Sequence, residues 1–299
     1  MKESCVSFTT LGDYISSFYN ENKQFLEANY PGISLGRLKL ELKNFCRILD
    51  SQFDDIYISE NKGVIEEFLK KVKLGIPLEY ISNRSFFYRS SFYINENVLI
   101  PRSETEIMVE WTAEYIRKNR LDHIKIADIG TGSGAIALSL AGEIGEIDAE
   151  IIASDISEKA LDVARANKFF HRYRYPKTVK LKFQQSDRME NIPGDLDIII
   201  TNPPYIKENA DLSEVHGQVH SFEPHLALYL KDQDYDNWFK TFFDQAQKKL
   251  KNGGLFIMEG SELHLERLKD ILGEYNFGEL ELIKDYTDRY RFLKGRKNG

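Results

Sequence analysis

A buried strand that stops abruptly at a rigid polar tip is the first candidate for chemistry in this sequence. Residues 195–201 include an apolar run, Leu196, Ile198, Ile199 and Ile200, typical of a strand buried on both faces. Asn202-Pro203-Pro204-Tyr205 follows directly. Two consecutive prolines cannot donate hydrogen bonds to a sheet and favour an extended backbone, so the strand must end there. Open α/β sheets bind their ligands at the carboxyl ends of such strands.

A glycine-rich loop, Asp128-Ile129-Gly130-Thr131-Gly132-Ser133-Gly134, joins another predicted strand to its helix. Glycines at alternate positions let the backbone approach a ligand closely, and the N-terminus of the following helix presents free N–H groups. A dinucleotide site of the Gly-x-Gly-x-x-Gly type would have Ala135 at its last position, which is tolerable. Asp128 favours another ligand, because a carboxylate there would repel a pyrophosphate but would suit an ammonium group.

Two more aspartates follow the next predicted strands. Asp155 lies 21 residues beyond Gly134, where a carboxylate can bind both hydroxyls of a ribose. Asp187 follows the third strand and could accept a hydrogen bond from an adenine amino group. Each aspartate alone is better explained as a loop or helix cap. Spaced one per strand end, they indicate a nucleoside held across the top of the sheet.

The elements that would position these residues alternate between strands and helices. The pattern predicts strands at 124–129, 149–154, 179–183, 196–201, 255–258, 279–283 and 290–293, and helices at 135–141, 158–170, 238–250 and 263–272. A Gly253-Gly254 turn is predicted before the strand at 255–258. This alternation predicts an α/β fold with a doubly wound, mostly parallel sheet, in which the last two strands can pair antiparallel.

The residues before this region predict a smaller part of different character. Apolar stripes at helical spacing within 11–26, 38–49 and 64–72 predict a bundle of three amphipathic helices. Residues 86–100 predict a β-hairpin with a polar turn at Asn95-Glu96-Asn97, and Ser103 with Glu106 forms a capping-box pattern. The predicted domains are therefore a helical domain over 1–75, a linker with the hairpin over 76–105 and a catalytic domain over 106–299.

Composition excludes several classes of protein. The 299 residues are 42% hydrophobic and 29% charged, as in soluble globular proteins, and no apolar run approaches the roughly 20 residues that span a membrane. Cys5 and Cys46 make neither a disulfide framework nor a zinc site, so we predict a cytoplasmic protein. The net charge of −7 argues against a large phosphate-binding face. No metal site is predicted, since Gly217 and Pro224 break any helix face shared by the nearby histidines, His216, His220 and His225.

The glycine loop, Asp155, Asp187 and Asn202-Pro203-Pro204-Tyr205, in this order, resemble a class I S-adenosylmethionine-dependent methyltransferase of the amino-methylating kind. The resemblance implies a seven-stranded Rossmann-like sheet with its last strand antiparallel. It also implies S-adenosylmethionine as the cofactor, with S-adenosylhomocysteine as product. The implied cofactor-binding residues are Thr105, Asp128, Gly130, Thr131, Gly132, Gly134, Asp155, Asp187 and Asn202.

In such an enzyme the target is a planar nitrogen whose lone pair is delocalised. The Asn202 side-chain oxygen and the Pro203 carbonyl can each accept one N–H of an –NH2 group, which orients the group and localises its lone pair. The adjoining Pro204 keeps these acceptors rigid, so little reorganisation is needed. Tyr205 offers a ring face to the planar target. We therefore predict Asn202, Pro203 and Tyr205 as catalytic residues, with Pro204 as a further substrate contact.

Nucleic-acid amines and the glutamine amide share this tip, and the rest of the chain separates them. Segments 75–81 and 98–106, together with Phe222-Glu223-Pro224 and Asp285-Tyr286, resemble the HemK/PrmC family. That family methylates the glutamine of the Gly-Gly-Gln motif in class I peptide chain release factors. The resemblance implies such a release factor as partner, docked by the helical domain. We expect a monomer that binds neither membranes nor nucleic acid directly.

The chain departs from the family at four places. Ser103 stands where the family usually has proline, and Arg188 where an aromatic or apolar residue is commoner. Tyr229-Leu230-Lys231-Asp232 replaces a glycine-rich turn, and Glu259-Gly260-Ser261-Glu262 only loosely matches a turn that begins with glutamate.

Two rival functions share some of these features. A glutamine methyltransferase acting on a ribosomal protein would share the same chemistry. An adenine-directed nucleic-acid methyltransferase would need a basic groove; the aromatic and basic run at 169–175 comes closest, and we interpret it as a solvated helix end.

Overall fold

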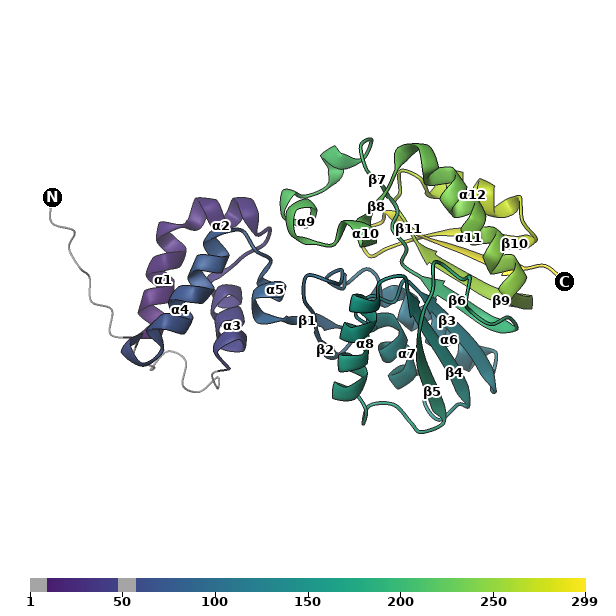
Figure 1. Ribbon diagram of the computed structural model, residues 1–299, viewed down its shortest axis with the longest axis horizontal. Helices are drawn as coiled ribbons and strands as arrows, with labels where there is room; N and C mark the ends of the chain where they lie inside the picture. Colours follow the sequence, from purple (N-terminus) through teal and green to yellow (C-terminus); the bar gives the residue numbers. More distant parts are fainter. Residues whose placement is uncertain (1–9, 48–57) are drawn as a thin grey trace. The chain divides into compact units, whose positions relative to one another are not determined.

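The computed structural model describes residues 10–47 and 58–299, which form two compact units (Figure 1). One unit comprises Met1–Arg84 with His216–Phe222, and the other comprises Ser85–Val215 with Glu223–Gly299. The predicted linker at 76–105 is thus divided between the two units after Arg84. Cys5 and the end of the predicted apolar stripe at 38–49, residues 48 and 49, lie outside the described residues.

The smaller unit is a helical bundle. It contains α1 (Leu11–Glu21), α2 (Lys23–Asn29), α3 (Leu35–Cys46), α4 (Ile58–Lys73), α5 (Leu78–Ser82) and, from much later in the chain, α9 (Gly217–Phe222). The predicted apolar stripes supply its core, including Leu11, Ile15, Leu38, Leu42, Ile65 and Phe68. The first stripe spans two helices, because the helix is interrupted at Asn22, between α1 and α2. The Gln218 side chain on α9 donates to the carbonyl of Gly75 at 2.8 Å.

The larger unit contains a seven-stranded sheet in the order β10-β11-β9-β6-β3-β4-β5. Its strands are β3 (Ile124–Ile129), β4 (Ala149–Asp155), β5 (Val179–Gln185), β6 (Leu196–Thr201), β9 (Leu250–Glu259), β10 (Phe277–Lys284) and β11 (Tyr290–Lys297). The strands from β5 to β9 pair in parallel, and β11 pairs antiparallel with both β9 and β10. The predicted α/β fold with an antiparallel last strand is confirmed.

Helices cover both faces of this sheet (Figure 1). On one face α6 (Glu106–Lys118) and α7 (Ala135–Glu143) share a core with Ile198 and Ile200 of β6. On the other, α11 (Tyr235–Lys249) and α12 (Leu265–Gly273) share a core with Leu196 and Ile199. The strand β6 is therefore buried on both faces, as its apolar run predicts. Between β4 and β5 runs α8 (Glu158–Phe170).

The β-hairpin is present, but its predicted turn is wrong. It consists of β1 (Arg84–Phe87) and β2 (Ser90–Tyr93), joined through Tyr88 and Arg89, whose φ angles are +41° and +62°. Asn95-Glu96-Asn97 forms a separate turn, in which the Asn95 side chain accepts from the Asn97 N–H at 3.0 Å. The polar residues thus turn the chain by local hydrogen bonds, without pairing two strands.

Two boundary predictions are also wrong. Ser103 does not cap α6, because residues 103–105 form a turn before the helix begins at Glu106, and the Ser103 hydroxyl donates to Glu104 instead. Gly253-Gly254 lies inside β9, which starts at Leu250. The register between β6 and β9 shifts near its start, where the glycines let the strand continue through an irregularity.

The segment between β6 and α11 folds into short elements. They are β7 (Ile206–Lys207), the 3-10 turn η2 (Leu212–Glu214), α9, α10 (His225–Leu228), β8 (Tyr229–Leu230) and the 3-10 turn η3 (Asp232–Asp234). The strands β7 and β8 pair in parallel. Among the described residues, no helix combines the length and apolar character needed to cross a membrane.

Candidate active site

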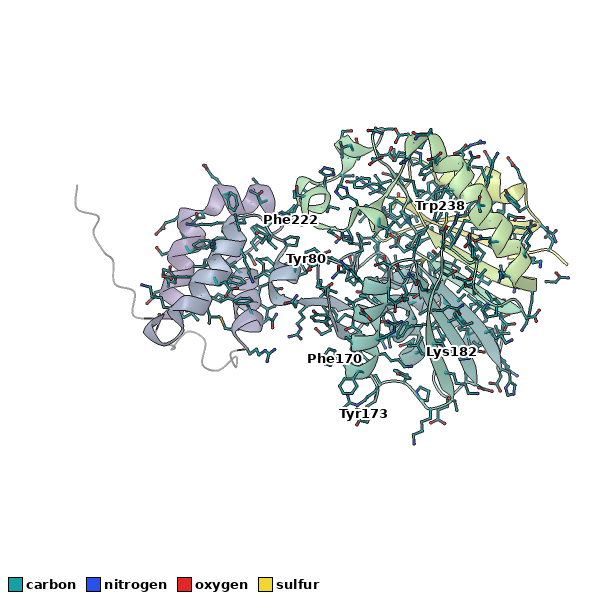
Figure 2. The ribbon with its side chains drawn as sticks, in the orientation of Figure 1. Tyr80, Phe170, Tyr173, Lys182, Phe222 and Trp238 are labelled. Carbon is teal, nitrogen blue, oxygen red and sulfur yellow. The ribbon has the colours of Figure 1, made fainter. Side chains whose placement is uncertain are left out.

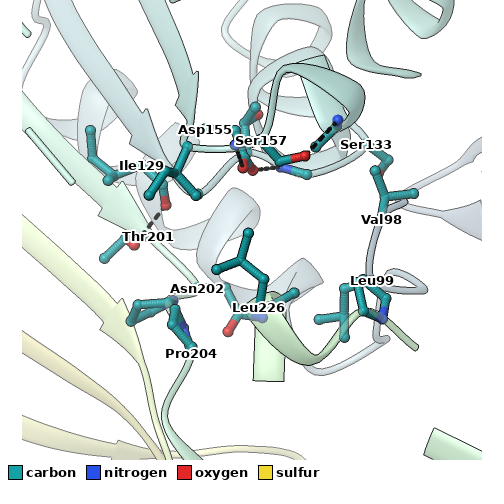
Figure 3. A pocket seen from close by; sticks show the side chains of 18 of the residues that line it. Val98, Leu99, Ile129, Ser133, Asp155, Ser157, Thr201, Asn202, Pro204 and Leu226 are labelled. Atoms are coloured by element: carbon teal, nitrogen blue, oxygen red, sulfur yellow. Dashed lines mark hydrogen bonds between the residues drawn. The ribbon is translucent and has the colours of Figure 1, made fainter. Parts of the chain in front are cut away.

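The carboxyl ends of β3, β4, β5 and β6 border a cavity of about 310 Å³ within the larger unit (Figure 3). Of the predicted residues, those on its wall are Thr105, Gly130, Thr131, Gly132, Asp155, Asp187, Asn202, Pro203 and Pro204. Asp128, Gly134 and Tyr205 are not on the wall and act from behind it. The cavity therefore lies at the edge of the sheet where parallel strands place their ligands.

The glycine loop forms one wall through a backbone that only glycine adopts easily. Gly134 has a φ of +80°, and a Cβ there would lie 3.2 Å from both Ala164 and Leu138. Gly130, with a φ of +72°, lies beside the backbone of Asn202, whose carbonyl oxygen would be 3.7 Å from an added Cβ. The Thr131 N–H donates to the Ser154 carbonyl at 2.8 Å, which ties the loop to β4. Close packing and positive φ angles both explain the glycine spacing.

Asp128 is fully buried beneath this loop. One carboxylate oxygen accepts from the Thr131 hydroxyl at 2.6 Å and from the Ala137 N–H at 3.2 Å. Its other oxygen, Oδ1, is buried and has no hydrogen-bond partner among the described residues. Burial raises the pKa of Asp128 to about 7. Such a group gains from a nearby cation, which fits the ammonium-bearing ligand predicted from the sequence.

Asp155 stands at the end of β4 and faces the cavity (Figure 3). Its two oxygens accept from the Gly132 N–H and the Ser157 N–H, each at 2.9 Å. Burial raises the pKa of this carboxyl, and the backbone donors act against that rise. Because each carboxylate oxygen has two lone pairs, both can still accept from the hydroxyls of a ribose.

At another part of the wall, Asp187 is held by its neighbour in sequence. The Arg188 guanidinium binds both Asp187 oxygens, at 3.1 and 2.9 Å, and lies 5.6 Å from the ring centre of Trp238. Arg188 has a φ of +49°, an uncommon backbone conformation for a residue with a side chain. The predicted adenine acceptor is therefore already engaged, at the position where this chain departs from the resembled family.

The tip after β6 is fixed from several directions. Thr201 donates to the Ile129 carbonyl at 2.7 Å, which joins the ends of β6 and β3 (Figure 3). The Asn202 amide donates from Nδ2 to the Thr105 hydroxyl at 3.2 Å. The Tyr205 hydroxyl donates to Glu259 at 3.2 Å, and the Tyr205 carbonyl accepts from the Tyr235 hydroxyl at 3.1 Å. Burial raises the pKa of Tyr205, and the charge of Glu259 adds to the rise, so the phenol stays protonated at neutral pH.

Two buried acids at this site were not predicted from the sequence. Glu259, at the end of β9, is 2% exposed and accepts from Thr105 and Tyr205. Glu223, which is 4% exposed, pairs with Arg102 and accepts from the Ile100 N–H at 3.0 Å. Glu259 could have been found as an acidic residue that directly follows the predicted strand at 255–258. The partners of Glu223 are more than 120 residues away in sequence, and no local pattern indicates them.

The aromatic and basic run at 169–175 does not line the cavity. Phe170 and Tyr173 project outward near the end of α8 and are 62% and 85% exposed (Figure 2). The Arg172 guanidinium lies 4.2 Å from the ring centre of Phe169 and 4.5 Å from that of Tyr173. The run therefore forms an exposed cation–π cluster at a helix end.

The fold and this cavity define a class I methyltransferase. The family model described as "Methyltransferase small domain" matches residues 107–223. Among solved structures, a T. thermophilus 16S rRNA N2 G1207 methyltransferase in complex with AdoMet and guanosine has a similar fold, with a TM-score of 0.51 and 19% identity. That match covers 72% of this chain and 50% of the other.

Relatives of known name specify the family. The chain is 35% identical to the release factor glutamine methyltransferase of Flavobacterium psychrophilum, over 82% of each chain. It is 36% identical to that of Leptospira interrogans, over 87% of this chain and 86% of the relative. The chain belongs to the release factor glutamine methyltransferase family.

Proposed function

We propose that this protein transfers a methyl group from S-adenosylmethionine to the side-chain amide nitrogen of a glutamine. The proposed glutamine is that of the Gly-Gly-Gln motif in class I peptide chain release factors. The observation that carries the proposal is the likeness to named release factor glutamine methyltransferases over more than four fifths of the chain. The amide and carbonyl acceptors on the cavity wall, Asn202 and Pro203, are chemically suited to that target.

The acceptor groups on and behind the cavity wall fit S-adenosylmethionine. The unpartnered Asp128 oxygen lies beneath the loop and suits a ligand that carries an ammonium group. Asp155 retains lone pairs for a ribose, and the glycine loop permits close backbone approach. When bound, this cofactor supplies an electrophilic methyl group on a sulfonium. The assigned cofactor-binding residues remain Thr105, Asp128, Gly130, Thr131, Gly132, Gly134, Asp155, Asp187 and Asn202.

The chain's own residues bind and orient the target. Asn202 Oδ1 and the Pro203 carbonyl accept the two amide hydrogens, and Pro204 limits their movement. Tyr205 lies behind the cavity wall, where its hydroxyl and its carbonyl are both held, and it supports the tip from there. Positioning the reacting atoms about 3–3.5 Å apart is the main contribution that such a site makes. No strong base is needed, because the methylated amide cation loses its proton readily.

The helical unit is the proposed docking region for the release factor. Its surface exposes apolar side chains, among them Leu40 at 50% and Leu74 at 61% exposure. The proposal includes a monomeric, cytoplasmic enzyme whose partner is a protein and which needs neither a membrane nor nucleic acid.

The test is methylation of a purified release factor, followed by mass spectrometry of its Gly-Gly-Gln peptide. We expect one added methyl group on the glutamine, and none on a release factor in which that glutamine is replaced by alanine. A ribosomal protein and an adenine-containing RNA are offered in parallel. Methylation of either, with the release factor unmodified, contradicts the proposed substrate.

A further inference from the structure

We propose that Glu259 is a positioning residue that sets the orientation of the Asn202 amide through the Thr105 hydroxyl. The inference rests on the proposed amide methylation and concerns residues that are distant in sequence. Glu259 ends β9, next to β6, where Thr201 pairs with Met258. Glu259 and Asn202 are therefore the next residues along two neighbouring parallel strands. The carboxylate lies at the base of the tip.

The first step is the direction of the Thr105 hydroxyl. Thr105 is 4% exposed, and its Oγ1 lies 2.6 Å from Glu259 Oε2. An ionised carboxylate has no proton to give and can only accept. The single Thr105 proton must therefore point at Glu259, which leaves only lone pairs on Thr105 Oγ1.

The second step is the orientation of the Asn202 amide. Its nearest polar contact is Thr105 Oγ1 at 3.2 Å, and an oxygen with only lone pairs needs a donor. Asn202 therefore presents Nδ2 to Thr105. If the amide were rotated by 180°, Oδ1 would face the Thr105 oxygen with no proton between them. In the observed orientation Oδ1 has no donor among the residues that the structure describes, and Asn202 lines the cavity. This oxygen is the one that must accept a hydrogen of the target amide.

The other carboxylate oxygen fixes the far end of the same tip. Glu259 Oε1 accepts from the Tyr205 hydroxyl at 3.2 Å. One carboxylate thus holds both Thr105, and through it Asn202, and Tyr205. Because Glu259 is buried and is not on the cavity wall, it acts through these residues and does not serve as a base toward the target.

The test compares two substitutions at Thr105 with the same substitution at a matched site. Thr105→Val keeps the shape of the side chain but removes the hydroxyl, whereas Thr105→Ser keeps the hydroxyl. Thr112→Val is the control, since Thr112 on α6 is fully buried and its hydroxyl has no hydrogen-bond partner among the described residues. For each variant, kcat and KM on the release factor, the Kd for S-adenosylmethionine by calorimetry and the Tm are measured.

We expect Thr105→Val to lower kcat by about 10²-fold, with a change in cofactor Kd of less than about threefold. Thr105→Ser should restore most of the loss, and Thr112→Val should leave kcat unchanged. An unchanged kcat in Thr105→Val overturns the inference. A failure of serine to rescue also overturns it. So does a loss in cofactor affinity as large as the loss in kcat, which would mean that Thr105 acts only as a cofactor-binding residue.

A second readout does not depend on turnover. The side-chain amide signal of Asn202 is assigned in ¹⁵N spectra by its loss in Asn202→Asp, and its hydrogen-exchange rate is measured. Exchange should be slow in the wild type and in Thr105→Ser, and faster in Thr105→Val. Equal rates in all three overturn the inference. If the wild type leaves the release factor unmethylated, the proposed function fails, and the exchange rates still decide the role of Thr105 and Glu259.

Discussion

The two ends of the cavity hold their acidic groups in different ways. At the tip, Glu259 accepts from Thr105 and Tyr205, which come from segments far apart in sequence. At the wall that follows β5, Asp187 is bound at both oxygens by the adjacent Arg188. The first arrangement leaves Asn202 Oδ1 with no donor among the described residues. In the second, the group expected to meet the ligand is engaged by an ion pair. The tip is therefore preorganised, whereas a ligand at Asp187 must compete with the Arg188 guanidinium for the same carboxylate.

The largest expected effect is at the tip. Asn202→Ala should lower kcat on the release factor by about 10³-fold, because it removes an acceptor that needs no reorganisation. The Kd for S-adenosylmethionine, measured by calorimetry, should change by less than about threefold, since the remaining wall is intact. An unchanged kcat would remove the role assigned to Asn202.

Glu259→Gln tests the tip through the pH dependence of kcat. Burial raises the pKa of Glu259, and Glu104 adds to the rise, while the Thr105 and Tyr205 hydrogen bonds and the Arg291 charge oppose it. The ionised form orients Thr105, so kcat of the wild type should fall as pH drops through this raised pKa. In Glu259→Gln, kcat at neutral pH should be roughly tenfold lower, and the acidic decline should disappear. A pH–rate profile with the same acidic decline in both proteins would contradict this.

Substitutions at Asp187 and Arg188 should change the affinity for S-adenosylmethionine and not kcat. Asp187→Ala should weaken S-adenosylmethionine binding by about fivefold, the loss of roughly one hydrogen bond, with kcat at saturation nearly unchanged. Arg188→Ala frees the Asp187 carboxylate from its ion pair, so cofactor binding should become tighter. If Arg188→Ala weakens binding as much as Asp187→Ala, then Arg188 itself holds the ligand, and the proposed competition for Asp187 is wrong.

The smallest effect is expected outside the cavity. Phe170→Ala and Tyr173→Ala alter exposed rings at the end of α8 (Figure 2). Each should change kcat/KM on the release factor by less than about twofold, in the range of ordinary surface substitutions. A large loss in either would show that this cluster contacts the substrate.

The difference between the two ends also explains how much could be predicted from sequence. The tip is contiguous: β6 has its predicted bounds, 196–201, and the proline pair marks its end. Glu259 was missed because its partners Thr105 and Tyr205 are 154 and 54 residues away, and such contacts have no local pattern. The engagement of Asp187 depends on the side-chain conformation of Arg188, which residue types alone do not specify. The features that could not be predicted from the sequence are those that depend on long-range contacts or on side-chain conformation.

The same distinction applies to the fold. Strands and helices with strong periodicity, such as α8 at 158–170, match their predicted bounds. The hairpin turn was misplaced because Tyr88 and Arg89, rather than glycine or asparagine, adopt the positive φ angles. Residue propensities favour a hairpin turn at Asn95-Glu96-Asn97, whereas the pairing of β1 with β2 places the turn at Tyr88 and Arg89.

The assignment of α9 to the helical unit affects how this gene can be divided. The chain leaves the larger unit after Val215, contributes seven residues to the other and returns at Glu223. A single cut after Arg84 would therefore separate Gly75 from α9, whose Gln218 side chain donates to the Gly75 carbonyl. The returning chain supplies Glu223 for Arg102 and Pro224 for the cavity wall, so removing residues 216–222 would also disturb the cavity. Exchange of the helical unit of this chain therefore needs three junctions, one after Arg84 and one on each side of residues 216–222.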